Sequence, residues 1–585
     1  MHHNHLSRAM AILALFAIAA GPLAAQTTYG SIVGSARDVS GAMMPGVKIT
    51  VTNESTGESH ARETNEAGVY ALTTLYPGNY RLRGEMSGFR AVDIKGITLQ
   101  VNQTARFDVT MEVGQVTESI EVAATAPVLA TDTSDVGQVI NNKQIVDLPL
   151  NGRNFMQLAS LTNGVILSGT TESGGPNFLS EGGRPTQNSF LVEGVETRIQ
   201  REGRYGLNLS VDAIGEFKMM QNAFSAEFGR GATIVNSTIK SGGNDLHGSA
   251  FEFLRNNVLD ARNAFDLTGV IPPLRLNQFG ASAGGPIRRD KTFFFVNYEG
   301  QRVRRGTTRY ANVPTPAMLS GDLSGMATAI DPDTGLPFPG NQVPQNRFSQ
   351  FAKAGNPYYP QPNSTTLPNL NYVAVISNPT TMNQGTTRID HNLTTRDRLN
   401  GHVTFFWYET LNIGTMPYSG TQNFSKVRPN LSVEHTHTFN PNLLNNFRFG
   451  YSYTDSFTGP YPLLDHDVTR EFGLQNLKPE ANAYAPPQIN IQGFGSPGSG
   501  AWIPQGAIDV NTQFVEQLSY FRGRHALKAG ADLRLLRYDD LGYATQNGYY
   551  NFTNSMYSRN QVADYLLGLP QQAFANQSGG RGFQH

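Results

Sequence analysis

The sequence contains no cysteine. This absence excludes disulfide frameworks, thiolate nucleophiles and thiolate zinc sites, and it excludes a lipoprotein anchor, which is attached through a cysteine. The sequence also has no excess of one charge sign, because its 45 Lys and Arg and 46 Asp and Glu give a net charge of −1. This balance gives no reason to expect a nucleic-acid partner.

Long apolar segments are nearly absent. Outside residues 9–20, no segment approaches the roughly 18 consecutive apolar residues of a membrane-spanning helix. Residues 9–20 follow a polar start that contains Arg8 and precede the small-residue site Leu23-Ala24-Ala25, and the run is too short to span a bilayer. This arrangement predicts an export signal over residues 1–25, so we expect the chain to cross the inner membrane and leave it.

Motifs of catalysis and metal binding are also missing. The sequence has no phosphate-binding loop, no GxSxG and no HExxH. His60 and Glu63 have an HxxE spacing, but residues three apart on a strand point to opposite faces and do not share a metal ion. We therefore expect no catalytic residue, no metal site and no cofactor.

The composition, with 60 Gly, 32 Pro and 23 Tyr, favours turns and strands, and residues 27–113 show the alternation of a small all-β domain. Val47, Ile49 and Val51 alternate with polar residues, which indicates strands with one buried face. The domain resembles the carboxypeptidase regulatory-like family, an accessory module of transthyretin-like β-sandwich fold. The resemblance rests on GSIVG, PGV, TNEAGVY and LYPGNY at residues 30–34, 45–47, 64–70 and 75–80.

Residues 114–130 form a linker. Within it lies an extended acidic and apolar stretch that resembles a TonB box and consists of Glu118, Ser119, Ile120, Glu121, Val122, Ala123 and Ala124. Such a box has to be a strand that pairs edge-on with a partner's sheet, because backbone hydrogen bonds then supply the grip. The resemblance implies TonB and its proton-driven inner-membrane motor as partners.

Residues 131–243 resemble the plug of TonB-dependent outer-membrane receptors, most closely the Oar-like subgroup. The motifs are LPLNGRNF, EGGRPTQNSFLVEGV, IGEFK, FSAEFGR and VNSTIKSGG at residues 148–155, 181–195, 214–218, 224–230 and 235–243. Plugs of this kind often carry Leu-Asp-Gly-Val, whereas this chain has Val192-Glu193-Gly194-Val195, so the carboxylate is kept on a longer arm. We expect a mixed sheet that contacts the barrel wall through Arg153, Arg184, Glu193, Glu227 and Arg230, and the alternative is that these are solvated surface charges.

Residues 244–585 have the pattern of an antiparallel transmembrane β-barrel, with apolar and polar residues alternating over ten-residue segments. Nine strands are expected at about 247–255, 276–286, 292–302, 384–394, 399–411, 430–439, 444–457, 510–521 and 526–538. Short turns and long connections alternate between them, as in barrels with periplasmic turns and external loops. Since bacterial barrels of one chain have even strand counts, we expect an incomplete barrel, from a truncated gene product or a fragment, that does not form a stable pore alone.

The expected fold is therefore mainly β: a sandwich, a mixed plug and a partial barrel in the outer membrane, with the sandwich in the periplasm. The first functional hypothesis is energised import of an external glycan, peptide or siderophore by plug displacement. The second is a structural or adhesion protein that binds through its external loops without transport. A periplasmic enzyme is the third, and it lacks a visible catalytic set.

Overall fold

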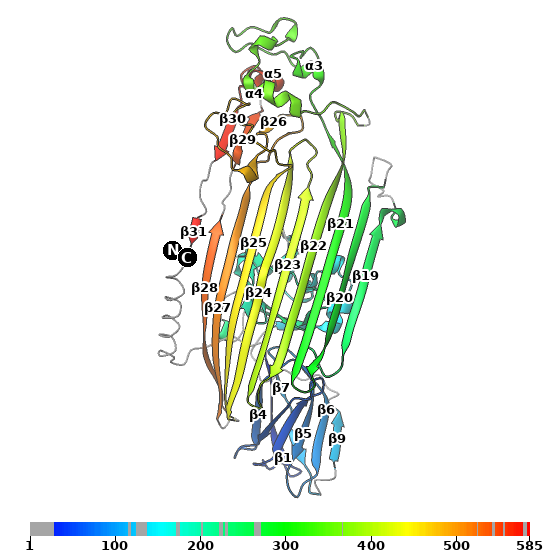
Figure 1. Ribbon diagram of the computed structural model, residues 1–585, viewed down its shortest axis with the longest axis vertical. Coiled ribbons are helices and arrows are strands. Elements are labelled where there is room, and N and C mark those ends of the chain that lie inside the picture. Colours follow the sequence, from blue (N-terminus) through cyan, green and yellow to red (C-terminus); the bar gives the residue numbers. More distant parts are fainter. Residues whose placement is uncertain are drawn as a thin grey trace.

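A computed structural model of the chain describes residues 29–114, 119–123, 137–170, 176–199, 203–221, 226–228, 232–261, 271–365, 367–440, 442–522, 525–540, 545–553, 556–576 and 582–584. The expected export signal at residues 1–25 lies outside the described residues. Within them, no helix has both the length and the apolar character needed to cross a bilayer. Four parts follow one another: a sandwich at one end, a plug, a large curved sheet and a cap at the far end (Figure 1).

The N-terminal sandwich consists of two sheets with the strand orders β4-β1-β7, in which β8 also pairs with β1, and β3-β2-β5-β6-β9. Its strands are β1 Gly30–Asp38, β2 Lys48–Asn53, β3 Ser59–Glu63, β4 Val69–Leu75, β5 Gly78–Glu85, β6 Ala91–Leu99, β7 Thr104–Arg106, β8 Val109–Met111 and β9 Ser119–Ala123. Ile49 and Val51 are completely buried between the sheets, so the inward face expected from the alternation is confirmed.

The plug contains a five-stranded mixed sheet of order β10-β17-β18-β13-β14, in which only β13 and β18 run parallel. Its elements are β10 Gly137–Asn141, α2 Asn142–Asp147, η1 Asn151–Arg153, η2 Phe155–Leu161, β11 Val165–Thr170, β12 Pro176–Ser180, η3 Pro185–Gln187, β13 Asn188–Val192, β14 Val195–Glu196, β15 Arg198–Ile199, β16 Arg204–Tyr205, β17 Ile214–Gln221, η4 Ala226–Phe228 and β18 Thr233–Ile239. Phe155 and Phe217 pack edge to face in its core.

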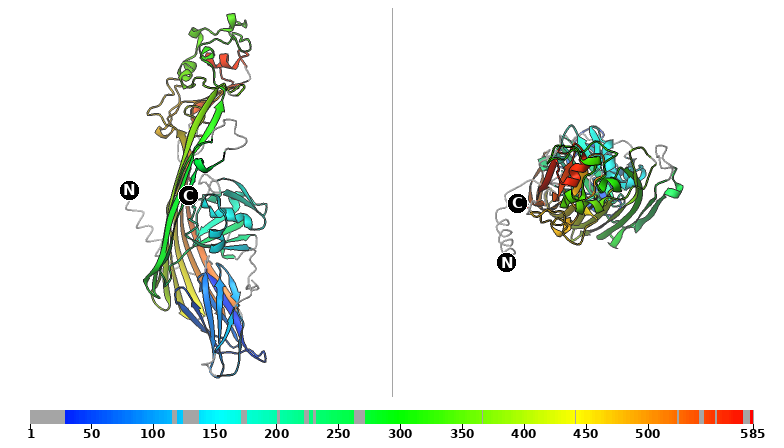
Figure 2. Two further views of the ribbon diagram at one scale, coloured as in Figure 1. Left: turned by 90° about the vertical axis from the view of Figure 1, so that its right-hand side faces the viewer. Right: turned by 90° about the horizontal axis from the view of Figure 1, so that it is seen from above.

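The large sheet has ten antiparallel strands in the order β19-β20-β21-β22-β23-β24-β25-β27-β28-β31. They are β19 His247–Asn256, β20 Leu274–Arg288, β21 Thr292–Ala311, β22 Tyr372–Asn392, β23 Asp397–Asn412, β24 Gly420–Asn440, β25 Leu443–Tyr461, β27 Gln505–Arg522, β28 His525–Asp540 and β31 Gly582–Gln584. All nine expected strands are confirmed, and each is longer than expected. The plug lies against the concave face of the sheet (Figure 2).

The two faces of the sheet differ in the way that a transmembrane barrel requires. In β23, Phe405 and Trp407 on the outer face are 44% and 43% exposed. Thr404 and Phe406 on the inner face are each 1% exposed, and Phe406 joins the plug core. Apolar residues therefore point away from the plug and polar residues line the interior.

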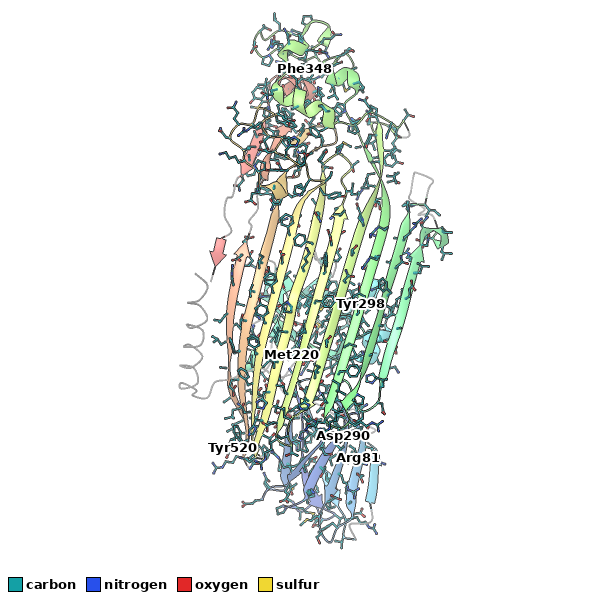
Figure 3. All side chains as sticks on the ribbon, in the orientation of Figure 1. Arg81, Met220, Asp290, Tyr298, Phe348 and Tyr520 are labelled. Carbon is teal, nitrogen blue, oxygen red and sulfur yellow. The ribbon has the colours of Figure 1, made fainter. Side chains whose placement is uncertain are left out.

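Short turns and long connections lie at opposite ends of the sheet. The turns at residues 289–291 and 393–396 and the described turn residue Asn442 lie next to the sandwich, where Figure 3 labels Asp290 and Tyr520. The connections at residues 312–371 and 462–504, where Figure 3 labels Phe348, lie at the cap end. The expected alternation of short and long connections is thus confirmed.

The long connections, expected as external loops, fold into a cap with its own core. The cap holds a three-stranded sheet, β26-β29-β30, and an aromatic cluster of Phe351, Phe472, Phe552 and Tyr565. Its elements are α3 Pro316–Leu319, η6 Pro339–Asn341, η7 Gln345–Arg347, α4 Gln350–Gly355, η8 Asn356–Tyr358, η9 Ala481–Ala483, β26 Gln488–Ile491, β29 Thr545–Phe552, α5 Gln561–Leu567 and β30 Gln572–Asn576, and η5 Asn257–Leu259 lies in a separate loop. This core joins three connections, so no single segment carries its pattern.

Candidate functional site

The tip of the plug hairpin between β13 and β14 is the centre of the plug–wall interface. Val192 pairs with Val195, which leaves Glu193 and Gly194 as the two turn residues, with φ of 49° and 76°. A two-residue turn with both φ values positive matches the twist of the hairpin, and Glu193 is strained in this conformation. Gly194 is also required by space, because a Cβ there would collide with the guanidinium of Arg448 on the wall.

Glu193 connects the plug to β22 of the wall. Its Oε1 accepts hydrogen bonds from Nη1 of Arg388 and from the backbone N–H of Ile239, each at 2.6 Å. Arg388 also donates to Asp390 on its own strand, at 2.9 Å from Nη2. The Arg388 side chain is only 4% exposed, so it carries a buried charge that two carboxylates share.

Glu196, three residues further along the hairpin, repeats this arrangement on β28. Nη1 of Arg534 lies 3.1 Å from Oε2 of Glu196, and Nη2 of Arg534 donates to Oδ2 of Asp532 at 2.6 Å. A third wall arginine, Arg448 on β25, donates from Nε to Glu434 at 2.7 Å. Each of the three arginines thus has a carboxylate on the wall itself.

This pairing balances the wall arginines independently of the plug. A buried charge that loses its partner is strongly destabilising, whereas a pair that stays together is not. The Arg388–Asp390 and Arg534–Asp532 pairs lie wholly on the wall. Neither arginine therefore relies on the plug alone for its counter-charge.

The other expected plug–wall residues differ in their placement. Arg153 pairs with Asp212 inside the plug and stacks on the wall residues Phe251 and Phe253, with its Cζ at 4.1 and 5.3 Å from the ring centroids. Glu227 lies 3.8 Å from Nζ of Lys528 on β28. The Arg184 side chain is exposed, and Arg230 lies outside the described residues.

The sandwich docks on the turn end of the sheet. Arg398 of β23 pairs with Glu58 at 3.2 Å, and its Cζ lies 3.5 Å from the ring centroid of Tyr76. Burial raises the pKa of Glu58, but the charge of Arg398 and a hydrogen bond with His60 outweigh it and lower the pKa to about 2. Glu58 is therefore a carboxylate at any pH at which the protein works.

A loop of the sandwich also contacts the plug. The backbone N–H of Val101 donates to Oε1 of Glu216 in β17, and Nζ of Lys218 donates to the carbonyl oxygen of Asn102 at 3.0 Å. Burial raises the pKa of Glu216 to about 7, although Val101 and Lys218 oppose the shift. The sandwich, the plug and the wall thus meet at one end of the sheet.

Five of the seven residues of the expected TonB box are described, and they form strand β9. This strand pairs in parallel with β6 of the sandwich, in a register that joins Ala91 to Ser119 and Lys95 to Ala123. Glu118 and Ala124 lie outside the described residues. The expectation of an extended segment with strand geometry agrees with this placement.

A cavity of about 940 Å³ lies between the plug and the cap-side ends of β20 to β23. The plug contributes apolar residues such as Leu148 and Leu161, and the wall contributes hydrogen-bonding groups from Gln301, Tyr408 and Asn412. A combination of apolar surface and a few polar groups is typical of small-molecule sites.

The wall arginines were missed by the sequence reasoning, although a signal was present. Arg388 and Asp390, and likewise Asp532 and Arg534, are two residues apart on strands and therefore share a face. A pair of opposite charges on the face turned from lipid is unusual enough to mark a contact with the plug.

A sheet with an apolar outer face that wraps a separately folded plug, through a polar and largely buried interface, defines a plugged outer-membrane receptor. The chain belongs to the outer membrane beta barrel domain family, whose match spans residues 238–585, and it therefore lies in the outer membrane. Residues 31–112 match the carboxypeptidase regulatory-like domain. The resemblances to TonB-dependent receptors and to the carboxypeptidase regulatory-like family are confirmed, whereas the TonB box at residues 118–124 stays a prediction.

A relative in Myxococcus xanthus, described as TonB-dependent transporter Oar, is 26% identical over 331 residues, which are 53% of this chain and 30% of the relative. Among solved structures, the outer membrane transporter YddB from Escherichia coli has a TM-score of 0.45 at 11% identity, covering 71% of this chain and 50% of that one. The siderophore receptor PirA from Acinetobacter baumannii has a TM-score of 0.38 at 12% identity, covering 69% and 48%. The chain therefore spans less than a third of the curated relative and about half of each solved chain.

Proposed function

We propose that this protein is a TonB-dependent receptor that imports an external ligand by displacement of its plug. TonB pairs with the segment at residues 118–124 and pulls, the plug leaves its place against the wall, and the ligand passes. The observation that carries this proposal is the sharing of Arg388 and Arg534 between plug and wall carboxylates, because it lets a buried polar interface open and close again. No covalent chemistry is needed, so the protein acts as a transporter and not as an enzyme.

The ligand approaches from the cap side and the motor from the sandwich side. The cavity beside Leu148 and Tyr408 lies at the cap-side ends of β20 to β23, and the sandwich with β9 lies at the end of the short turns, which face the periplasm in barrels of this kind. The polar and apolar lining of the cavity suits a glycan, a peptide or a siderophore.

Deleting residues 118–124 tests the proposal against the adhesion alternative. Cells that carry the variant are given three labelled pools: oligosaccharides, peptides and ferric siderophores. We expect uptake of the transported pool to be lost while attachment of cells to surfaces is unchanged. Unchanged uptake of every pool that the unaltered protein imports would refute the proposal.

A disulfide that fixes the plug to the wall gives a second test in this cysteine-free chain. A Cβ built at Gly450 of β25 lies 3.3 Å from Cβ of Val195 at the plug hairpin, close to the separation in natural disulfides. Oxidation of the Val195→Cys, Gly450→Cys variant should stop uptake, and reduction should restore it. The matched control is Ile166→Cys with Leu179→Cys, two facing positions of the plug hairpin β11–β12, which should leave uptake unchanged.

A further inference from the structure

The sandwich has an edge that ends in the segment expected to bind TonB. Strand β9 is the terminal strand of the sheet β3-β2-β5-β6-β9, and it pairs with β6 at five consecutive positions. Within the described residues, the opposite edge of β9 pairs with no strand. Figure 1 shows β9 at the outer side of the sandwich, beside β6.

The topology of the sandwich explains how this strand is held. Two parallel neighbours in one sheet need a crossover, and here the chain crosses through β7 and β8 of the opposite sheet before it returns as β9. Pairing ends at Lys95, directly before Gly96, whose φ of 78° belongs to a bulge against β5. Within the described residues, the platform on β6 therefore consists of the five positions 91–95.

The β6 platform is rigid and lies away from the docking contacts. Its residues Val92 and Ile94 belong to the sandwich core. The contacts with the wall and the plug come instead from loops at one end of the sandwich, at Glu58, Tyr76 and Val101. The outer edge of β9 is therefore free of the interface that holds the sandwich to the barrel.

We propose that the sandwich displays the TonB box as a preformed edge strand, and that TonB binds by adding its own strand to the open edge of β9 while β9 stays on β6. This inference rests on the proposed function, because it takes TonB as the partner. An open edge is a template for pairing with another chain. A strand that is ordered in advance loses less conformational freedom on binding, so display increases affinity compared with a free linker.

A disulfide between β6 and β9 tests whether β9 remains in place. Neighbouring strands lie about 4.8 Å apart, within the range of Cα separations that a disulfide bridges. Lys95→Cys with Ala123→Cys joins two register partners. Lys95→Cys with Ser119→Cys is the control, since these positions are four residues out of register, about 13 Å apart, and should not cross-link.

The measurement is binding of the purified periplasmic domain of TonB to the detergent-solubilised protein, with the oxidised and reduced forms of the same variant compared. We expect the oxidised form to bind as tightly as the reduced form or up to about tenfold more tightly. Binding that is lost on oxidation and returns on reduction would overturn the inference, because it would mean that β9 has to leave β6 first.

Hydrogen exchange on the unaltered protein gives a measurement that needs no substitution. We expect the amides of residues 91–95 to stay protected when the TonB domain binds, and those of residues 119–123 to become more protected. Loss of protection at residues 91–95 would overturn the inference that β9 stays paired with β6 when TonB binds. The proposed function fails on a different result, namely undiminished TonB binding after deletion of residues 118–124.

Discussion

Two carboxylates, Glu193 of the plug and Glu58 of the sandwich, each hold a part of the molecule to a wall arginine, and the two pairs are built differently. Arg388, the partner of Glu193, keeps Asp390 on its own strand. Among the described residues, Arg398 has Glu58 as its one ion-pair partner, and its Nε is buried without a hydrogen bond. Arg388 therefore keeps an ion pair on its own strand, whereas the wall carboxylate of Asp390 acts on Arg398 only at longer range, without an ion pair.

The two contacts therefore differ in what balances the wall arginine apart from the carboxylate that docks on it. At the plug contact a carboxylate on the same strand also pairs with the arginine, and at the sandwich contact the described residues supply no second ion pair. The comparison predicts effects of different size for equivalent substitutions at the two sites.

The largest effect is expected for Glu58→Gln. The substitution removes the one ion-pair partner that the largely buried Arg398 has among the described residues. Asp390 compensates this charge only at longer range, so we expect docking of the sandwich to weaken by about 2–3 kcal/mol. Protease cleavage between sandwich and barrel in the membrane-embedded protein measures the change. Glu54→Gln, at an exposed carboxylate of the same sandwich, is the matched control, and equal cleavage of the two variants would contradict the comparison.

The next largest effects are expected for two substitutions that change plug retention in opposite directions. Glu193→Gln leaves Arg388 balanced by Asp390 and should weaken plug retention by about 1 kcal/mol, the loss of a charge-assisted hydrogen bond. Asp390→Asn makes Arg388 depend on Glu193, so plug departure becomes more costly and retention should increase. The amide at position 390 still accepts the hydrogen bond of Ser241. The urea concentration at which the plug becomes protease-sensitive should fall for the first variant and rise for the second; a shift in the same direction for both would contradict shared pairing.

The sequence predicted the lipid-facing part of the strands better than their cap-side ends. β22 was expected from residue 384 but begins at Tyr372, and β24 was expected from residue 430 but begins at Gly420. Alternation reports a strand only where one face meets lipid and the other meets a polar interior. Toward the cap both faces are wet, so the strand continues while its pattern fades.

Contacts between distant segments could not be predicted from the sequence for a different reason. The motif at residues 192–195 drew attention to Glu193, but which wall arginine meets it depends on the strand register of the folded sheet. The pairing of β9 with β6 likewise depends on a crossover through the second sheet. Local pattern identifies such elements and leaves their partners open.

A smaller effect is expected from pH at the contact between sandwich and plug. The pKa of Glu216 is raised by burial from the ordinary value of 4.5 to about 7, so its contribution to stability is fully present below pH 4.5 and is lost as pH rises through about 7. Exchange of the Val101 amide, corrected for its intrinsic rate, should therefore speed up between pH 5.5 and 8. Glu216→Gln should remove this dependence, and a dependence that persists in the variant would assign it to another group.

The smallest effect is expected at Lys528, whose ammonium group pairs with Glu227 of the plug at 3.8 Å and whose side chain is 46% exposed. Water already hydrates this ammonium group, so departure of the plug leaves no charge uncompensated. A wall carboxylate such as Asp390, which pairs with Arg388, is therefore not needed at Lys528. Lys528→Ala should therefore change the free energy of plug release, obtained from the urea transition, by at most about 0.5 kcal/mol, and by less at high salt. Arg184→Ala, at an exposed plug residue, gives the baseline. A loss at Lys528 as large as that at Glu193 would mean that proximity of charges, and not their burial and shared pairing, determines how firmly the plug is held.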